Sequence, residues 1–157
     1  MEVLGLDHVD LTVTHLDRAI DFYQTVLSAL GFSRVEHSTY VAWSNGKLNI
    51  AVREAADEHR KTRFDRTRSG LHHLALKAKT RGDVDTLHSL LIEKGLTVLD
   101  APAEYPKYGP DYYAVFFADP DGTKLELVHF PWGYWRRVQQ DGHDERARSD
   151  RPANPED

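Results

Sequence analysis

The chain has 157 residues, of which 40% are hydrophobic and 29% charged, which is typical of a soluble globular protein with a substantial core. Its net charge of −5 argues against nucleic acid binding, because phosphate contacts require a surface rich in Lys and Arg. The absence of cysteine excludes disulfides, thiolate metal ligands and cysteine nucleophiles, so a transition-metal site would need His and carboxylates. No signal peptide or membrane span is recognisable, and we expect a cytoplasmic protein.

The first half of the chain is predicted to form one strand, one helix and three further strands. Polar and apolar residues alternate over residues 4–13, which predicts a strand with one apolar face. Apolar residues at helical spacing then predict a helix that ends at Gly31, with Thr14 or Asp17 as its cap. The pair Asn45-Gly46 indicates a type I′ hairpin turn. The strands expected after the helix are residues 33–37, 39–44 and 47–53.

The second half repeats this order after a charged segment without periodicity, residues 54–69. The expected elements are a strand at 71–78, a helix at 82–94, and strands at 97–99, 113–118 and 124–129. Residues 100–112 are rich in Pro, Gly and Tyr and are expected to form a loop. Residues 119–122, Asp-Pro-Asp-Gly, are typical of a tight turn.

The two halves also match in sequence. LDHVDLTV parallels HHLALKA, and GKLNIAV parallels TKLELV, so His8 corresponds to His73 and Asn49 to Glu126. We therefore predict an α+β fold in which two βαβββ modules form a curved mixed sheet. The predicted division is a first module at 1–53, a linker at 54–69, a second module at 70–130 and a polar, partly disordered C-terminal extension at 131–157.

Three side chains of the duplicated modules indicate a metal site. His8 and His73 hold equivalent places on the first strands of the modules, and Glu126 lies on the last strand of the second. Each is opposite the apolar alternation, so the three converge if these strands line a common concavity. Two imidazoles and a carboxylate suit a divalent Zn, Ni, Mn or Fe ion with open positions for substrate. Each residue alone could equally be a hydrogen-bonded or solvated strand residue.

Other residues are candidates for substrate contacts. Asn49 is expected to line the pocket or to hold a water molecule. The tyrosines of the 100–113 segment could face a ligand or pack the loop, and Lys124 and Arg53 could neutralise an anionic substrate or be solvated. By alternation, His72 and His129 point away from the three predicted ligands. The segment contains Tyr105, Tyr108, Tyr112 and Tyr113, and the residues selected as substrate-binding are Asn49, Tyr105, Tyr108 and Tyr113.

These segments resemble the vicinal oxygen chelate superfamily, also called the glyoxalase/bleomycin-resistance/dioxygenase family. The resemblance covers residues 4–130 and rests on LDHVDLTV, DRAIDFYQTVLSALGF, GLHHLAL and YYAVFFADPDGTKLELVH. It implies the two-His-one-Glu pattern of fosfomycin-resistance enzymes and extradiol dioxygenases for His8, His73 and Glu126. The chain departs from glyoxalase I at Asn49, where Glu or Gln would be expected, and from thiol-transferring fosfomycin enzymes at Phe116, where they have tyrosine.

The resemblance implies a metal-dependent enzyme that acts on a small oxygenated substrate by lyase, isomerase or epoxide-opening chemistry. Glu126 is also a candidate catalytic base. The alternatives are an Fe(II) extradiol-type dioxygenase and a non-catalytic protein that sequesters a drug or metabolite, as bleomycin-resistance proteins do without a metal. We expect a homodimer, because isolated βαβββ sheets have edges that need partners. Modules of this family pair within one chain or across a dimer, and both arrangements stay open.

Overall fold

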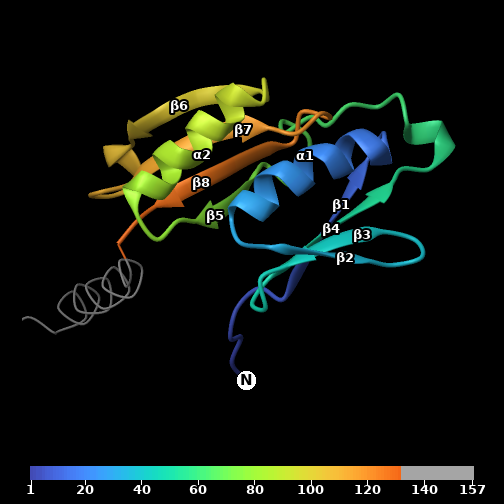
Figure 1. Cartoon of the computed structure of the whole chain (residues 1–157), viewed down its shortest axis with the longest axis horizontal. Coiled ribbons are helices and arrows are strands. Elements are labelled where there is room, and N and C mark those ends of the chain that lie inside the picture. Colours follow the sequence, from blue (N-terminus) through green and yellow to red (C-terminus); the bar gives the residue numbers. More distant parts are fainter. Residues whose placement is uncertain (132–157) are drawn as a thin grey trace, which may run out of the picture.

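The computed structural model describes residues 1–131 and contains two α-helices and eight strands (Figure 1). The element order is βαβββ twice, which confirms the predicted fold class. All but the first residue of the predicted extension 131–157 lies outside the described residues. The elements are β1 (His8–Val13), α1 (Leu16–Ala29), β2 (Ser33–Glu36), β3 (Val41–Ser44), β4 (Asn49–Glu54), β5 (Leu74–Lys77), α2 (Arg81–Glu93), β6 (Val98–Glu104), β7 (Tyr113–Ala118) and β8 (Lys124–His129).

Each module forms its own four-stranded mixed sheet. The strand orders are β1-β4-β3-β2 and β5-β8-β7-β6, so the two sheets have the same arrangement. In each sheet the first strand runs parallel to the last, and the remaining pairs are antiparallel. As a result, β1 and β5 lie at the edges of their sheets, each with a single hydrogen-bonded neighbour among residues 1–131.

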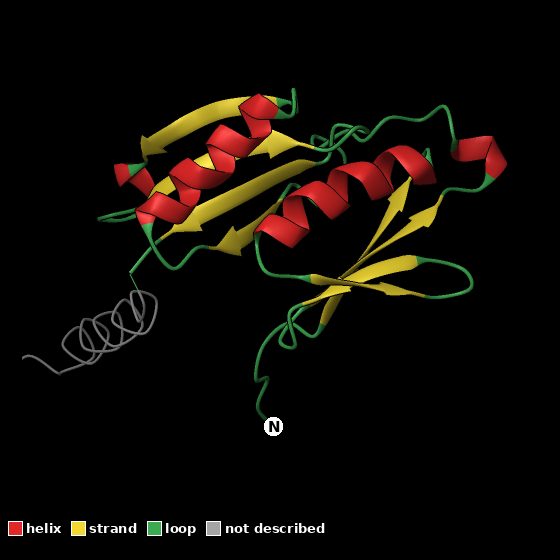
Figure 2. Cartoon of the chain, viewed as in Figure 1, coloured by secondary structure: helices red, strands yellow, loops and turns green. Residues whose placement is uncertain are grey.

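Both modules contribute to one apolar core. Helix α1 packs on β2, β3 and β4, helix α2 packs on β6, β7 and β8, and the helices touch each other (Figure 2). Neither helix of residues 1–131 has the length and apolar character needed to cross a membrane. The core is built from the apolar residues that alternate along the strands and recur along the helices, among them Leu11, Val13, Phe22, Trp43, Ile50, Val84, Leu91, Val115, Phe117 and Leu127.

Polar contacts to the turn that precedes β8 join the modules. The backbone N–H of Thr14 donates to Asp121 Oδ2 at 2.6 Å, and the Thr14 hydroxyl donates to Oδ1 of the same carboxylate. The Tyr23 hydroxyl donates to buried Asp119 at 2.9 Å. The N-cap of α1 is therefore not Thr14 or Asp17 but His15, whose side chain makes no capping hydrogen bond. The prediction of the cap was wrong because Thr14 serves this contact between modules.

Two further predictions are corrected by backbone geometry. The β3–β4 connection has a positive φ at Gly46 (78°) but not at Asn45, which excludes a type I′ turn with Asn45 and Gly46 at its centre. The side chain of Asn45 instead accepts hydrogen bonds from two backbone N–H groups of the turn. Strand β6 extends to Glu104, through residues expected to be a loop. Pro102 is tolerated there because β6 is an edge strand whose register with β7 shifts between Asp100 and Ala103.

Candidate functional site

Glu126 is a charged side chain buried in an apolar part of the molecule. It is 1% exposed, and it points to the sheet face that also carries Val128 of β8 and Ala114 and Phe116 of the neighbouring β7. Burying a carboxylate is costly unless polar groups surround it. The Tyr112 hydroxyl donates to Oε1 at 2.6 Å, and His73 Nε2 lies 3.1 Å from Oε2. Both carboxylate oxygens are therefore engaged by side chains from other segments.

His73 reaches Glu126 because of the parallel pairing of β5 with β8. Ala75 lies opposite Glu126 in this register, and His73 is two residues before Ala75. The side chains of His73 and Glu126 therefore point to the same face of the sheet. The other ring nitrogen of His73, Nδ1, lies 2.8 Å from Nδ1 of His72. Histidines that bind metals commonly have their second nitrogen hydrogen-bonded in this way, which fixes the ring. His72 thus contacts His73 directly, although strand alternation pointed it away.

Aromatic rings of the segment before β7 cluster around Tyr112, the hydrogen-bond partner of this carboxylate. The rings of Tyr105 and Tyr108 are stacked with their centroids 6.1 Å apart, and the ring centroids of Tyr108 and Tyr112 are 5.2 Å apart. The Tyr105 ring meets the Phe116 ring edge-on at 5.2 Å. Burial raises the pKa of Tyr112 well above its usual value, and its hydrogen bond to Glu126 adds to this shift. The tyrosine hydroxyl therefore stays protonated as a donor to the carboxylate.

Tyr113 does not belong to this group of rings, and its selection as a substrate-binding residue stays a prediction. Its hydroxyl donates to Asp85 of α2 at 2.7 Å, and its ring packs against the core shared by the modules. Tyr112, which precedes it, takes the place beside Glu126. The sequence contained a sign of this position, because alternation places Tyr112 on the same face as Ala114 and Phe116.

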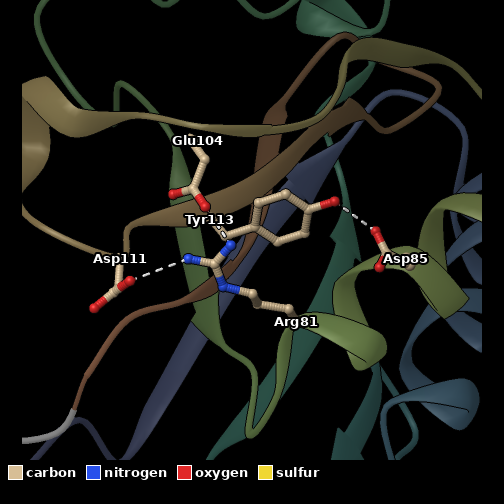
Figure 3. Close-up of polar contacts among 5 residues, drawn as sticks. All are labelled: Arg81, Asp85, Glu104, Asp111 and Tyr113. Carbon is tan, nitrogen blue, oxygen red and sulfur yellow. Dashed lines mark hydrogen bonds and ion pairs between the residues drawn. The ribbon is translucent and has the colours of Figure 1, made fainter.

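An arginine at the start of α2 fixes the two ends of the tyrosine-bearing segment (Figure 3). Arg81 pairs with Glu104, at the end of β6, and lies 3.3 Å from Asp111, just before β7. Its guanidinium also lies 5.1 Å from the centroid of the Tyr113 ring. Asp111 has a positive φ of 61°, which is uncommon for a residue with a side chain. The arginine therefore joins both ends of the segment that carries Tyr105, Tyr108 and Tyr112.

His8 and Asn49 lie together on the other sheet. They are register partners on β1 and β4. Asp7 Oδ2 lies 2.9 Å from His8 Nδ1, and this hydrogen bond raises the pKa of the imidazole. Within residues 1–131 no three His, Asp or Glu side chains are grouped closely enough to hold a metal ion. The structure thus brings His73 to Glu126 but does not bring His8 to them within one chain.

The chemistry of the His73–Glu126 pair fits a divalent metal. An imidazole nitrogen and a carboxylate oxygen are the ligand types that Zn, Mn, Fe and Ni accept, and a pair of ligands needs at least one more for a stable site. A separate cavity of about 620 Å³ lies between the end of α1 and α2. It is lined mainly by aliphatic residues and by no histidine, so it is not part of the candidate metal site at His73 and Glu126.

Comparisons with known proteins show the family of the chain. The model of the Glyoxalase/Bleomycin resistance protein/Dioxygenase superfamily matches residues 5–127. The chain belongs to this superfamily. The uncharacterized protein YqjT from Bacillus subtilis is 31% identical over 124 residues, which cover 78% of this chain and 97% of YqjT. The metallothiol transferase FosB of Shouchella clausii is 26% identical over 125 residues and covers 80% of each chain.

A solved structure extends the comparison to the fold. The crystal structure of a glyoxylase/bleomycin resistance protein/dioxygenase domain from Frankia sp. superposes with a TM-score of 0.68 at 27% identity. The match covers 83% of this chain and 100% of the Frankia domain. The resemblance inferred from the sequence is thereby confirmed for both family and fold.

Proposed function

We propose that the chain is a metal-dependent enzyme that acts on a small oxygenated substrate. The observation that carries the proposal is the Glu126 carboxylate, which is buried in an apolar face with His73 Nε2 3.1 Å away. A buried carboxylate beside an imidazole is costly as a purely structural pair, and such pairs concentrate at functional sites. The likeness to a metallothiol transferase supports metal dependence.

The third ligand is proposed to come from a second copy of the chain. His8 lies on β1, an edge strand of the first sheet, and His73 directly precedes β5, an edge strand of the second sheet. Edge strands offer unpaired N–H and C=O groups, and a homodimer that brings β1 of one protomer beside β5 of the other would use both edges. His8 of one protomer then meets His73 and Glu126 of its partner.

Each residue of the site has a distinct proposed role. The ion would supply Lewis acidity towards a substrate oxygen. His73 and Glu126 hold it, while His72 and Tyr112 orient these two side chains by hydrogen bonds. The Phe116 ring, 6.4 Å from the His73 ring, keeps one side of the site apolar. Glu126 is the carboxylate available to move a proton beside a substrate carbonyl, as isomerase or lyase chemistry requires.

One observation favours a second candidate function. Tyr105, Tyr108 and Tyr112 form a cluster of rings, and such a surface suits a protein that sequesters an aromatic drug or metabolite without catalysis. The two functions differ in whether the protein needs a metal. An oxygenase reaction is a third alternative, which requires iron.

The first experiment measures the metal content of the purified chain and of two variants by elemental analysis. His8→Ala removes the exposed imidazole, and Glu126→Gln removes the charge of the buried carboxylate but keeps its shape. We expect about one Zn, Ni, Mn or Fe per wild-type chain and a loss of metal in both variants. His59→Ala, which changes an exposed histidine of the linker, is the control and should keep its metal.

Mixing the two variants tests the exchange between protomers. A heterodimer of His8→Ala and Glu126→Gln chains has one intact site if the ligands come from different chains, and none if they come from one. Random reassociation should therefore restore metal to about a quarter of the sites. If the mixture binds no metal, the exchanged dimer is contradicted. If the reconstituted wild type itself holds no metal, the proposed enzyme is contradicted and the sequestering function is favoured.

A further inference from the structure

Lys124 lies beside the His73–Glu126 pair. It precedes Glu126 by two residues on β8, so both side chains point to the face that carries Phe116. The rise of a strand places their Cα atoms about 6.5 Å apart. Lys124 Nζ lies 3.9 Å from the centroid of the Phe116 ring, and that ring is 6.4 Å from the His73 ring. The ammonium is therefore within the reach of a molecule bound to this pair.

The charge of Lys124 is not matched by a carboxylate within residues 1–131. No ion pair of this part of the chain includes Lys124, and the nearby Glu126 is engaged by Tyr112 and His73. Arg53 differs from Lys124 in this respect. It lies on β4, the equivalent strand of the first module, and forms an ion pair with Asp10. A lysine with an aromatic ring on one side and no carboxylate partner keeps its donors available to an anion.

We infer that Lys124 binds an anionic group of the substrate. The site then takes a small planar acid, whose carboxylate contacts Lys124 while other oxygens of the molecule approach His73 and Glu126. The exposed ring of Tyr108, stacked on Tyr105, suits such a molecule, because aromatic rings pack favourably on planar groups. This inference rests on the proposed function, since it specifies the substrate class of the same site.

The test compares two probes that differ only in charge. Protocatechuate carries two adjacent hydroxyls and a carboxylate on one ring, and its amide is neutral. Their affinities for the zinc-loaded full chain are measured by calorimetry, since zinc has no redox chemistry that would consume the catechol. We expect the wild type to bind protocatechuate roughly tenfold more tightly than the amide, which corresponds to about 1.4 kcal/mol.

Three variants distinguish the charge of Lys124 from its packing. Lys124→Met keeps an apolar chain over Phe116 and should lose the preference for the acid, whereas Lys124→Arg keeps the charge and should retain it. Lys94→Met removes a lysine at the end of α2, where it pairs with Glu93, and should behave as the wild type. A wild-type preference in Lys124→Met would overturn the inference, as would an equal loss of affinity for both probes.

Zinc content is measured separately for every variant. A wild-type chain that holds no zinc, or any of the other three metals, overturns the proposed function but does not by itself decide the role of Lys124. The same comparison is then made with benzoate and benzamide, which need no metal for binding. Lys124 is confirmed as the anion-binding residue if its charge alone sets the preference for benzoate, and it is rejected if Lys124→Met does not change that preference.

Discussion

Tyr112 is the residue whose removal tests the environment of Glu126 most directly. Its hydroxyl is the donor to Oε1 of a carboxylate that water does not reach. Tyr112→Phe leaves that oxygen without a partner, and an unsatisfied buried group of this kind costs about 1–3 kcal/mol. We expect this loss in the free energy of unfolding of the metal-free protein, measured with urea. Metal affinity should also fall by about tenfold or more, because the orienting hydrogen bond is lost.

The matched control for Tyr112→Phe is Tyr108→Phe. Tyr108 belongs to the same ring cluster, but its side chain is exposed and its hydroxyl makes no hydrogen bond within residues 1–131. Removing it should change the free energy of unfolding by less than about 0.5 kcal/mol. Equal stability of the two variants would show that the Tyr112 hydroxyl contributes nothing to the burial of Glu126.

At the scale of elements, the segment between β6 and β7 depends on one side chain of α2. Arg81 contacts Glu104 and Asp111 on either side of it, and the Tyr105 N–H closes it by donating to the Tyr112 carbonyl at 2.8 Å. Arg81→Ala removes two exposed ion pairs, which together contribute about 1 kcal/mol of local stability, so the Tyr105 amide should exchange about fivefold faster with solvent hydrogen. Hydrogen exchange by NMR measures this.

Two further variants define what Arg81 contributes. Arg81→Lys should restore little of the protection, because an ammonium cannot bond two carboxylates with the fixed fork of a guanidinium. Arg34→Ala breaks an exposed pair with Glu36 on β2, in the other module, and should leave exchange of the Tyr105 amide unchanged. Unchanged exchange in Arg81→Ala would mean that the tyrosine-bearing segment is held by its ring contacts alone.

At the scale of the whole molecule, the hydroxyl of Tyr23 joins the two modules. Burial raises the pKa of Tyr23 well above its usual value of about 10, and the charge of Asp119 adds to the shift. Below about pH 10, the usual tyrosine pKa, both the folded and the unfolded chain keep the Tyr23 proton, and its contribution to the free energy of unfolding is fully present. Above it the unfolded chain loses the proton while the folded one keeps it, so the free energy of unfolding falls as the pH rises.

Tyr23→Phe should reduce this alkaline loss of stability. Urea unfolding at about pH 8 and about pH 11, on either side of the usual tyrosine pKa, measures it. At the lower pH the variant should be less stable by about 1–3 kcal/mol, because Asp119 loses a donor. Tyr108→Phe serves again as the control and should follow the wild type at both values. The same alkaline loss in Tyr23→Phe and wild type would assign that loss to other groups.

Much of the fold could be predicted because local patterns and tertiary packing agree. The alternation in β1 and β8, the helical spacing in α1 and the glycines with positive φ after both helices all appear in the structure as expected. The errors fall where a side chain does something that the local pattern does not contain. Thr14 bonds Asp121, far away in the sequence, and the register shift in β6 makes room for Pro102.

The sequence by itself determined the duplicated βαβββ order, the family and the faces on which His8, His73 and Glu126 lie, because strand periodicity and the internal repeat encode them. Only the tertiary structure decided which of these side chains meet. His73 and Glu126 meet because β5 pairs with β8, whereas His8 lies on a separate sheet of the same chain. Tyr112 and Lys124 acquire their places beside Glu126 in the same way. Pairing between strands is a long-range property, so it brings together residues whose spacing along the chain gives no sign of contact.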